Sequence, residues 1–188
     1  MNIDFLAPLP ELAVQIHQFN VDAGWWDEYK DDKFDRFETA MMLVVSELSE
    51  ALEGCRKNLM DDKLPDFKMF DVELADASLR LLDMAGAYIK FENPDSSLIY
   101  DEPIPNALKQ KLKDSTKPEQ LWTAVTILSE TAFSQPILSI TRGILVIREI
   151  AKLHDINLTT IMRLKTEFNA SRQDHKLENR EKEGGKKF

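Results

Sequence analysis

The chain has 188 residues, of which 43% are hydrophobic and 30% are charged, and its formal net charge is −9 at pH 7. This length suits one domain with a buried core, and the negative charge argues against a general nucleic-acid binder. The single cysteine, Cys55, excludes an internal disulfide and fits a reducing compartment. We see neither a signal peptide nor an apolar run of membrane-spanning length, so we expect a cytoplasmic protein without a membrane partner.

Apolar residues recur every three or four positions through most of the chain, and strand-like alternation is rare. The sequence therefore predicts a single all-α domain over residues 1–188. Asp35 is a candidate cap of the second helix, and Ser115 or Thr116 is a candidate cap of the fifth. The predicted helices span residues 10–22, 35–57, from after 66 to about 91, 106–113, 118–133, 136–154, and from 157 onward.

The first two predicted helices are separated by a loop that carries paired tryptophans, Trp25 and Trp26. A tryptophan in such a loop is usually buried as an anchor. Two consecutive indoles cannot easily both point inward, so one of them is a candidate for stacking on the flat ring of a ligand.

Two short acidic motifs, Glu47-Leu-Ser-Glu50 and Glu73-Leu-Ala-Asp76, fall on the second and third predicted helices. Residues three apart lie on nearly the same helical face, so each motif presents two carboxylates side by side. The neighbours on that face are mostly apolar, and unpaired carboxylates there would be costly. Such pairs are often solvated, but two on consecutive helices predict a cage for a hard divalent cation such as Mg²⁺.

Basic residues accompany these acids. Arg80 is predicted either to orient Asp76 or to form an ion pair on the helix surface, and the surface ion pair is favoured. The last predicted helix carries a polar stripe of Lys165, Asn169 and Arg172. Residues 163–188 hold eight Lys/Arg against five Asp/Glu, and residues 173–188 form a basic tail. Carboxylates that hold cations beside cations that hold phosphate would suit a metal-phosphate site, although on charge alone a solvated tail is the better explanation.

Five motifs, in this order, resemble those of the MazG-like nucleoside triphosphate pyrophosphohydrolases of the all-α pyrophosphatase superfamily. They are Gly-Trp-Trp-Asp, Ser-Glu-Leu-Ser-Glu-Ala-Leu-Glu-Gly, Val-Glu-Leu-Ala-Asp-Ala, Lys165-x-x-x-Asn169-x-x-Arg172 and Gly-Gly-Lys-Lys-Phe. The resemblance covers about residues 12–91 and 155–188. It implies a four-helix core, with extra helices in residues 92–154 inserted after the third helix.

The resemblance also implies the ligands of the site and the state of assembly. Mg²⁺, with Mn²⁺ as a possible substitute, would be bound by Glu47, Glu50, Glu73 and Asp76. Trp25 or Trp26 would lie against the base. Phosphate or sugar would contact Lys165, Asn169, Arg172, Lys186 and Lys187. The implied assembly is a homodimer or a dimer of dimers, and residues 92–154 would build its interface, cap the pocket or replace a partner's helix.

The activity implied is hydrolysis of a ribo- or deoxyribonucleoside triphosphate to the monophosphate and pyrophosphate, which suggests house-cleaning of the nucleotide pool. The metal ions would neutralise and align the triphosphate and lower the pKa of a bound water, whose proton Glu47 or Glu50 would take. The chain departs from several relatives at Ser46, where they carry an acid.

Three other functions compete with this one. The acids could hold only a structural cation or a nucleotide in a protein without activity. The chain could be a related enzyme that acts on phosphoribosyl-ATP, or a nucleic-acid accessory protein with a basic tail. A P-loop nucleotidase is disfavoured, because the sequence contains no G-x-x-x-x-G-K-[ST] motif.

Overall fold

The computed structural model describes residues 3–27, 37–92, 103–130, 132, 134–172 and 179, which contain seven helices and no β-strand. The predicted all-α fold is therefore confirmed for these residues. The helices are α1 (Leu9–Asp22), α2 (Phe37–Lys57), α3 (Met69–Glu92), α4 (Asn106–Asp114), α5 (Lys117–Glu130), α6 (Pro136–Leu153) and α7 (Leu158–Ser171).

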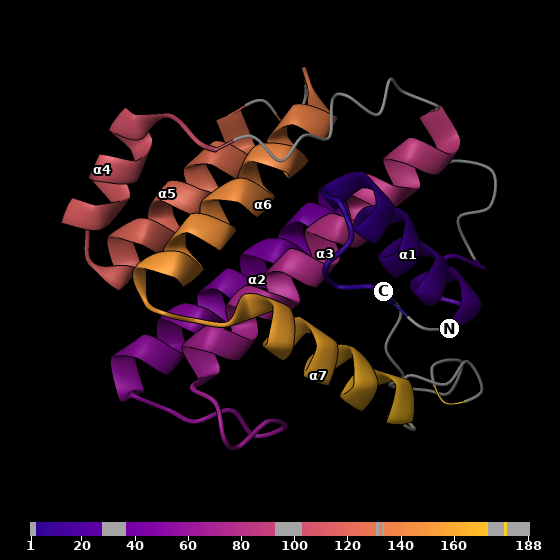
Figure 1. Cartoon of the computed structure of the whole chain (residues 1–188), viewed down its shortest axis with the longest axis horizontal. Coiled ribbons are helices and arrows are strands. Elements are labelled where there is room, and N and C mark those ends of the chain that lie inside the picture. Colours follow the sequence, from indigo (N-terminus) through magenta and orange to yellow (C-terminus); the bar gives the residue numbers. More distant parts are fainter. Residues whose placement is uncertain are drawn as a thin grey trace.

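The long helix α3 is the centre of the molecule, and α1, α2, α6 and α7 all pack against it. Figure 1 shows α1 and α7 on one side of the α2–α3 pair, with α4, α5 and α6 on the other. The three helices α4 to α6 lie within residues 92–154, between α3 and α7 in the chain. As a result, α7 lies beside one face of the α2–α3 pair, and polar residues of the three helices meet there.

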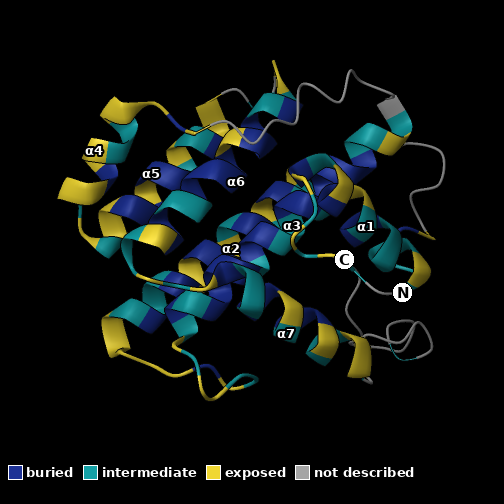
Figure 2. Cartoon of the chain, in the orientation of Figure 1, coloured by how far each residue is buried: buried dark blue, intermediate teal, exposed yellow. Residues whose placement is uncertain are grey.

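The core follows the apolar stripes of α2, α3 and α6, where buried residues are concentrated (Figure 2). Its largest fully buried side chains are Phe70, Leu9, Leu12, Ile16, Leu48, Leu74, Leu81, Leu82, Leu112, Leu128 and Ile140. Burial of such side chains contributes roughly 1.5–3 kcal/mol each before the entropy cost of ordering them. None of the helices in the described residues combines the length and apolar character that a membrane span requires.

A buried amide joins α4, α5 and the end of α6. The Gln120 side chain donates to the backbone oxygens of Leu112 at 2.8 Å and Ser115 at 3.2 Å. Its oxygen lies 2.7 Å from Nε2 of His154. Because an unmade hydrogen bond in the interior is costly, these contacts fix the extra helices on the core.

The helix ends agree with the sequence predictions to within a few residues, and the caps account for some of the differences. Helix α7 begins directly after Asn157, where a start was predicted, and the Asn157 side chain caps it by accepting from the N–H of Thr160 at 3.1 Å. Glu119 accepts from the N–H and hydroxyl of Thr116, which selects Thr116 over Ser115 as the cap residue directly before α5. The predicted cap of α2, Asp35, lies outside the described residues.

Helix α5 is described as far as Glu130, and its predicted end, residue 133, lies outside the described residues. Helix α6 ends at Leu153 instead of His154, because Asp155 adopts a positive φ of 55° that takes the chain out of the helix.

Helices α1 and α3 approach closely at Gly86. A Cβ at this position would lie 2.2 Å from the carbonyl oxygen of Ala13 and 2.5 Å from Cβ of His17. One of these neighbours is backbone, so the two helices would have to move apart to admit a methyl group. The contact between α1 and α3 thus depends on the absence of a side chain at residue 86.

We predict that Gly86→Ala lowers the free energy of unfolding by at least about 2 kcal/mol, although alanine is the better helix former. Urea denaturation monitored by circular dichroism measures the change. Lys90→Ala, an exposed position on the same helix, is the control and should change stability by no more than about 0.5 kcal/mol. Equal stabilities of Gly86→Ala and the wild type would contradict the close packing of α1 on α3.

Candidate functional site

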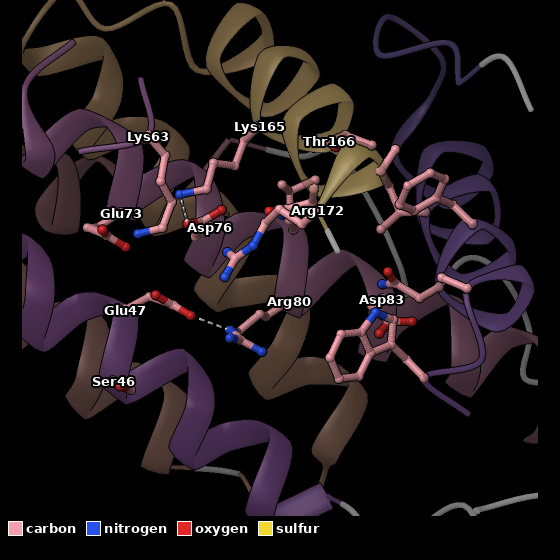
Figure 3. A pocket seen from close by; sticks show the side chains of 18 of the residues that line it. Ser46, Glu47, Lys63, Glu73, Asp76, Arg80, Asp83, Lys165, Thr166 and Arg172 are labelled. Carbon is pink, nitrogen blue, oxygen red and sulfur yellow. Dashed lines mark hydrogen bonds and ion pairs between the residues drawn. The ribbon is translucent and has the colours of Figure 1, made fainter. Parts of the chain in front are cut away.

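Three carboxylates from α2 and α3 converge at the centre of the molecule. Glu47 on α2 and Glu73 and Asp76 on α3 each place a carboxylate oxygen within 4.8 Å of the others (Figure 3). Glu47 and Glu73 are buried, and Asp76 is nearly so. The i, i+3 spacing in α3 puts Glu73 and Asp76 on the face that meets α2, which explains why acids from two predicted motifs come together.

Gathering these acids in a buried place changes their protonation. Burial, followed by the charge of Asp76 and by a hydrogen bond and charge from Glu47, raises the pKa of Glu73 to about 9. Burial also raises the pKa of Asp76, to about 6, against the opposing charge of Lys165. At neutral pH the metal-free protein therefore keeps a proton on Glu73 and leaves Asp76 mostly ionised.

Two of the three carboxylates form ion pairs with basic side chains. Lys165 of α7 is buried, and its Nζ lies 2.5 Å from Oδ2 of Asp76. Arg80 of α3 donates from Nε to Oε1 of Glu47 at 2.5 Å. Because the partners come from different helices, these pairs tie α7 to α3 and α3 to α2. The sequence favours an ion pair of Arg80 on the surface of its own helix. The structure instead shows Arg80 paired with Glu47 of the neighbouring helix.

The acids face a cavity of about 670 Å³. Several residues predicted to bind substrate also line it. Trp25 lies on its wall, together with Asn169 and Arg172 from the end of α7. The Oδ1 atom of Asn169 is buried without a hydrogen-bond partner among the described residues, which leaves an acceptor for a ligand. The cavity is large enough for a nucleotide-sized molecule.

Glu50 differs from the other three predicted metal ligands. It lines the cavity but is exposed, and it lies outside the close group of Glu47, Glu73 and Asp76. Ser46, which precedes the first acidic motif, also lines the cavity and is exposed. Glu50 is therefore placed to reach a ligand or a water from the side of α2, and its role as a ligand of the metal stays a prediction.

The two tryptophans take different places. Trp26 is buried, and its indole Nε1 donates to the Asp83 carboxylate at 3.0 Å. Its ring also packs edge-on against His17, whose Nδ1 lies 2.8 Å from the same carboxylate. Among the pair, Trp25 is the one that lines the cavity. This outcome agrees with the expectation that only one of the two indoles faces inward as an anchor.

Two further predicted residues, Lys186 and Lys187, lie outside the described residues. The structure adds a cavity residue that the sequence analysis did not single out, namely Lys63 in the loop between α2 and α3. No motif marks Lys63, because a lysine in an acidic loop is typical of a solvated surface. Only the fold of the loop brings it to the cavity.

A divalent cation fits this donor set. Hard cations such as Mg²⁺ take oxygen ligands, and Glu47, Glu73 and Asp76 offer three carboxylates on one wall of a polar cavity. Burial is the largest cause of the raised pKa values of Glu73 and Asp76, and a bound cation would favour the ionised carboxylates. If the cation displaced Lys165 and Arg80, these side chains would be available to other anions.

No protein-family model, curated protein or solved structure matches this chain. Function is therefore inferred from the motifs and from the geometry of the site.

The protonation of Glu73 predicts how stability depends on pH. The unfolded chain loses this proton near pH 4.5 and the folded protein only near pH 9, so the contribution of Glu73 to stability falls across this window. In EDTA, Glu73→Gln should therefore gain stability relative to wild type as pH rises, by at least about 1 kcal/mol at pH 9.

Urea denaturation at pH 5, 7 and 9 measures this difference. Glu53→Gln is the control, because Glu53 lies on α2 outside the cavity and pairs with Arg56 and Lys57. Its stability should follow the wild-type dependence on pH. A constant difference between Glu73→Gln and wild type at all three pH values would contradict a protonated Glu73.

Proposed function

We propose that this protein is a Mg²⁺-dependent nucleoside triphosphate pyrophosphohydrolase, which cleaves a ribo- or deoxyribonucleoside triphosphate to the monophosphate and pyrophosphate. The observation that carries the proposal is the convergence of three carboxylates and several cations on one cavity. Such a site binds both parts of a metal–phosphate ligand, because the acids hold the metal and the cations hold the phosphates. The motif resemblance supplies the reaction.

In this proposal Glu47, Glu73 and Asp76 hold the metal, which supplies positive charge to the phosphates and acidity to a coordinated water. Glu50 also lines the cavity but is exposed, so its carboxylate can reach a water there and suits a general base. Glu47 is less suited to that task, because Arg80 already pairs with its carboxylate. We therefore favour Glu50 as the residue that accepts a proton from the attacking water.

The cavity also offers groups for the substrate. Lys165 and Arg172 are positioned to contact phosphate once the metal neutralises the acids, and Asn169 offers its unpaired oxygen to a sugar hydroxyl. Trp25 offers an aromatic surface for the base. A homodimer or dimer of dimers, a nucleotide-pool role and a cytoplasmic location accompany this proposal as predictions from the sequence.

A second candidate is a nonenzymatic protein in which the same acids serve structure. The pairs of Lys165 with Asp76 and of Arg80 with Glu47 favour it, because they already satisfy two of the acids. It predicts that the pairs persist and that nucleotides are bound, if at all, without turnover. The burial of Glu73 argues against it, since a purely structural cluster would be more stable with an apolar residue there.

The activity test measures pyrophosphate release from a panel of ribo- and deoxyribonucleoside triphosphates with Mg²⁺, with Mn²⁺ as a second metal. We expect the monophosphate and pyrophosphate in equal amounts. Asp76→Asn and Glu50→Gln should fold and lose roughly 100-fold or more in kcat/KM, the scale of removing one group that stabilises the transition state. Glu53→Gln should retain wild-type turnover. No cleavage of any triphosphate by the wild type would reject the proposal.

A further inference from the structure

We propose that Lys63 forms a subsite for the terminal diphosphate of a bound nucleotide, the part that leaves as pyrophosphate. This inference rests on the proposed function, but it assigns a residue that no sequence motif marks. Lys63 lines the cavity from the loop of residues 58–68, whereas the other cavity residues named above lie on or next to helices.

The loop that carries Lys63 has a fixed backbone. Asp61 is buried, and its Oδ1 accepts from the N–H groups of Lys63 at 3.0 Å and Leu64 at 2.7 Å. The N–H of Asp61 donates to the carbonyl of Phe67 at 3.0 Å, and an antiparallel bridge joins Met60 to Lys68. A buried carboxylate that accepts two backbone bonds holds the turn in one conformation. Residue 63 is therefore positioned by the loop itself.

From this position the Lys63 side chain points toward the acids. Figure 3 shows its amine beside Glu73, at the edge of the cavity. Partial burial works against its charge, but the carboxylates of Asp62, Asp61 and Glu73 together raise its pKa above the usual value. The amine is thus fully charged at neutral pH and lies next to the proposed metal ligands.

The ion pair of Lys63 is weak enough for another anion to replace its partner. Its Nζ lies 2.8 Å from Oδ1 of Asp62, whose side chain is 78% exposed. Exposed pairs contribute only about 0–1 kcal/mol, so a phosphate can compete for this amine. Lys165, by contrast, is buried against Asp76. A lysine ammonium suits phosphate oxygens because it presents three donors around a compact charge.

The order of the residues along the cavity indicates which phosphates of a nucleotide Lys63 would contact. Figure 3 shows Lys63 and Glu73 at one end, Glu47 and Asp76 next to them, and Asp83 beside α1 at the other end. Trp25, the proposed base contact, lies three residues after the end of α1 and also lines the cavity. A nucleotide with its base near α1 and its α-phosphate at the acids would extend its terminal phosphates toward Lys63.

The test is calorimetric titration with pyrophosphate and, separately, with a nucleoside monophosphate, both in Mg²⁺. Lys63→Met should weaken pyrophosphate binding roughly 10- to 100-fold, the scale of one hydrogen bond to a charged group, and leave monophosphate binding within about twofold. Lys63→Arg should recover most of the affinity. Lys68→Met is the matched control, because Lys68 lies in the same loop and donates to Asn58 outside the cavity. It should bind both ligands like the wild type.

The outcomes separate this inference from the proposed function. Unchanged pyrophosphate affinity in Lys63→Met overturns the subsite, and so does equal weakening of both ligands or a wild type that binds no pyrophosphate. A wild type that binds pyrophosphate through Lys63 but cleaves no triphosphate supports the subsite and rejects the proposed reaction. Melting midpoints of all three variants equal to that of wild type confirm that the loop is intact.

Discussion

The burial of three carboxylates between α2 and α3 is the constraint on which the rest of the site depends. Charges this close in a poorly hydrated place repel one another, and each must be neutralised. The metal-free protein meets this demand in three ways. Glu73 keeps a proton. Asp76 forms an ion pair with Lys165, and Glu47 forms one with Arg80. Each carboxylate is therefore neutralised, and a divalent cation could replace the proton and the two basic side chains.

The fold around the acids follows from this constraint. Helix α7 brings Lys165 across α3, and the same helix continues to Asn169 and Arg172 on the cavity wall. The loop between α2 and α3 brings a further cation, Lys63. Cations arranged around acids in this way can exchange partners. If a divalent cation occupied the carboxylates, as proposed, the lysines and arginines would become available to a phosphate ligand.

Much of this site could be predicted from sequence, because helical periodicity places acids three residues apart on one face. The pairing of the two motifs and the all-α fold followed from that periodicity. The different positions of the individual residues in the site did not follow from it. Glu50 has the same local pattern as Glu47, yet only Glu47 joins the close group, because Glu47 is buried where α2 packs on α3 and Glu50 is exposed. Trp25 and Trp26 likewise differ only through their tertiary surroundings, in which Trp26 reaches Asp83. Lys63 carried no signal, since its position depends on hydrogen bonds made by Asp61.

The central claim is that these acids form a cation site whose occupation displaces the proton of Glu73. Calorimetric titration of metal-free protein with Mg²⁺, in buffers of different ionisation enthalpy, counts the protons released. At pH 7.5 about one proton should leave per bound Mg²⁺, and about half as many at pH 9, where Glu73 is half ionised. The release of this proton on Mg²⁺ binding should be absent in Glu73→Gln. Failure of Mg²⁺ to bind, or binding at pH 7.5 without proton release, would contradict the claim.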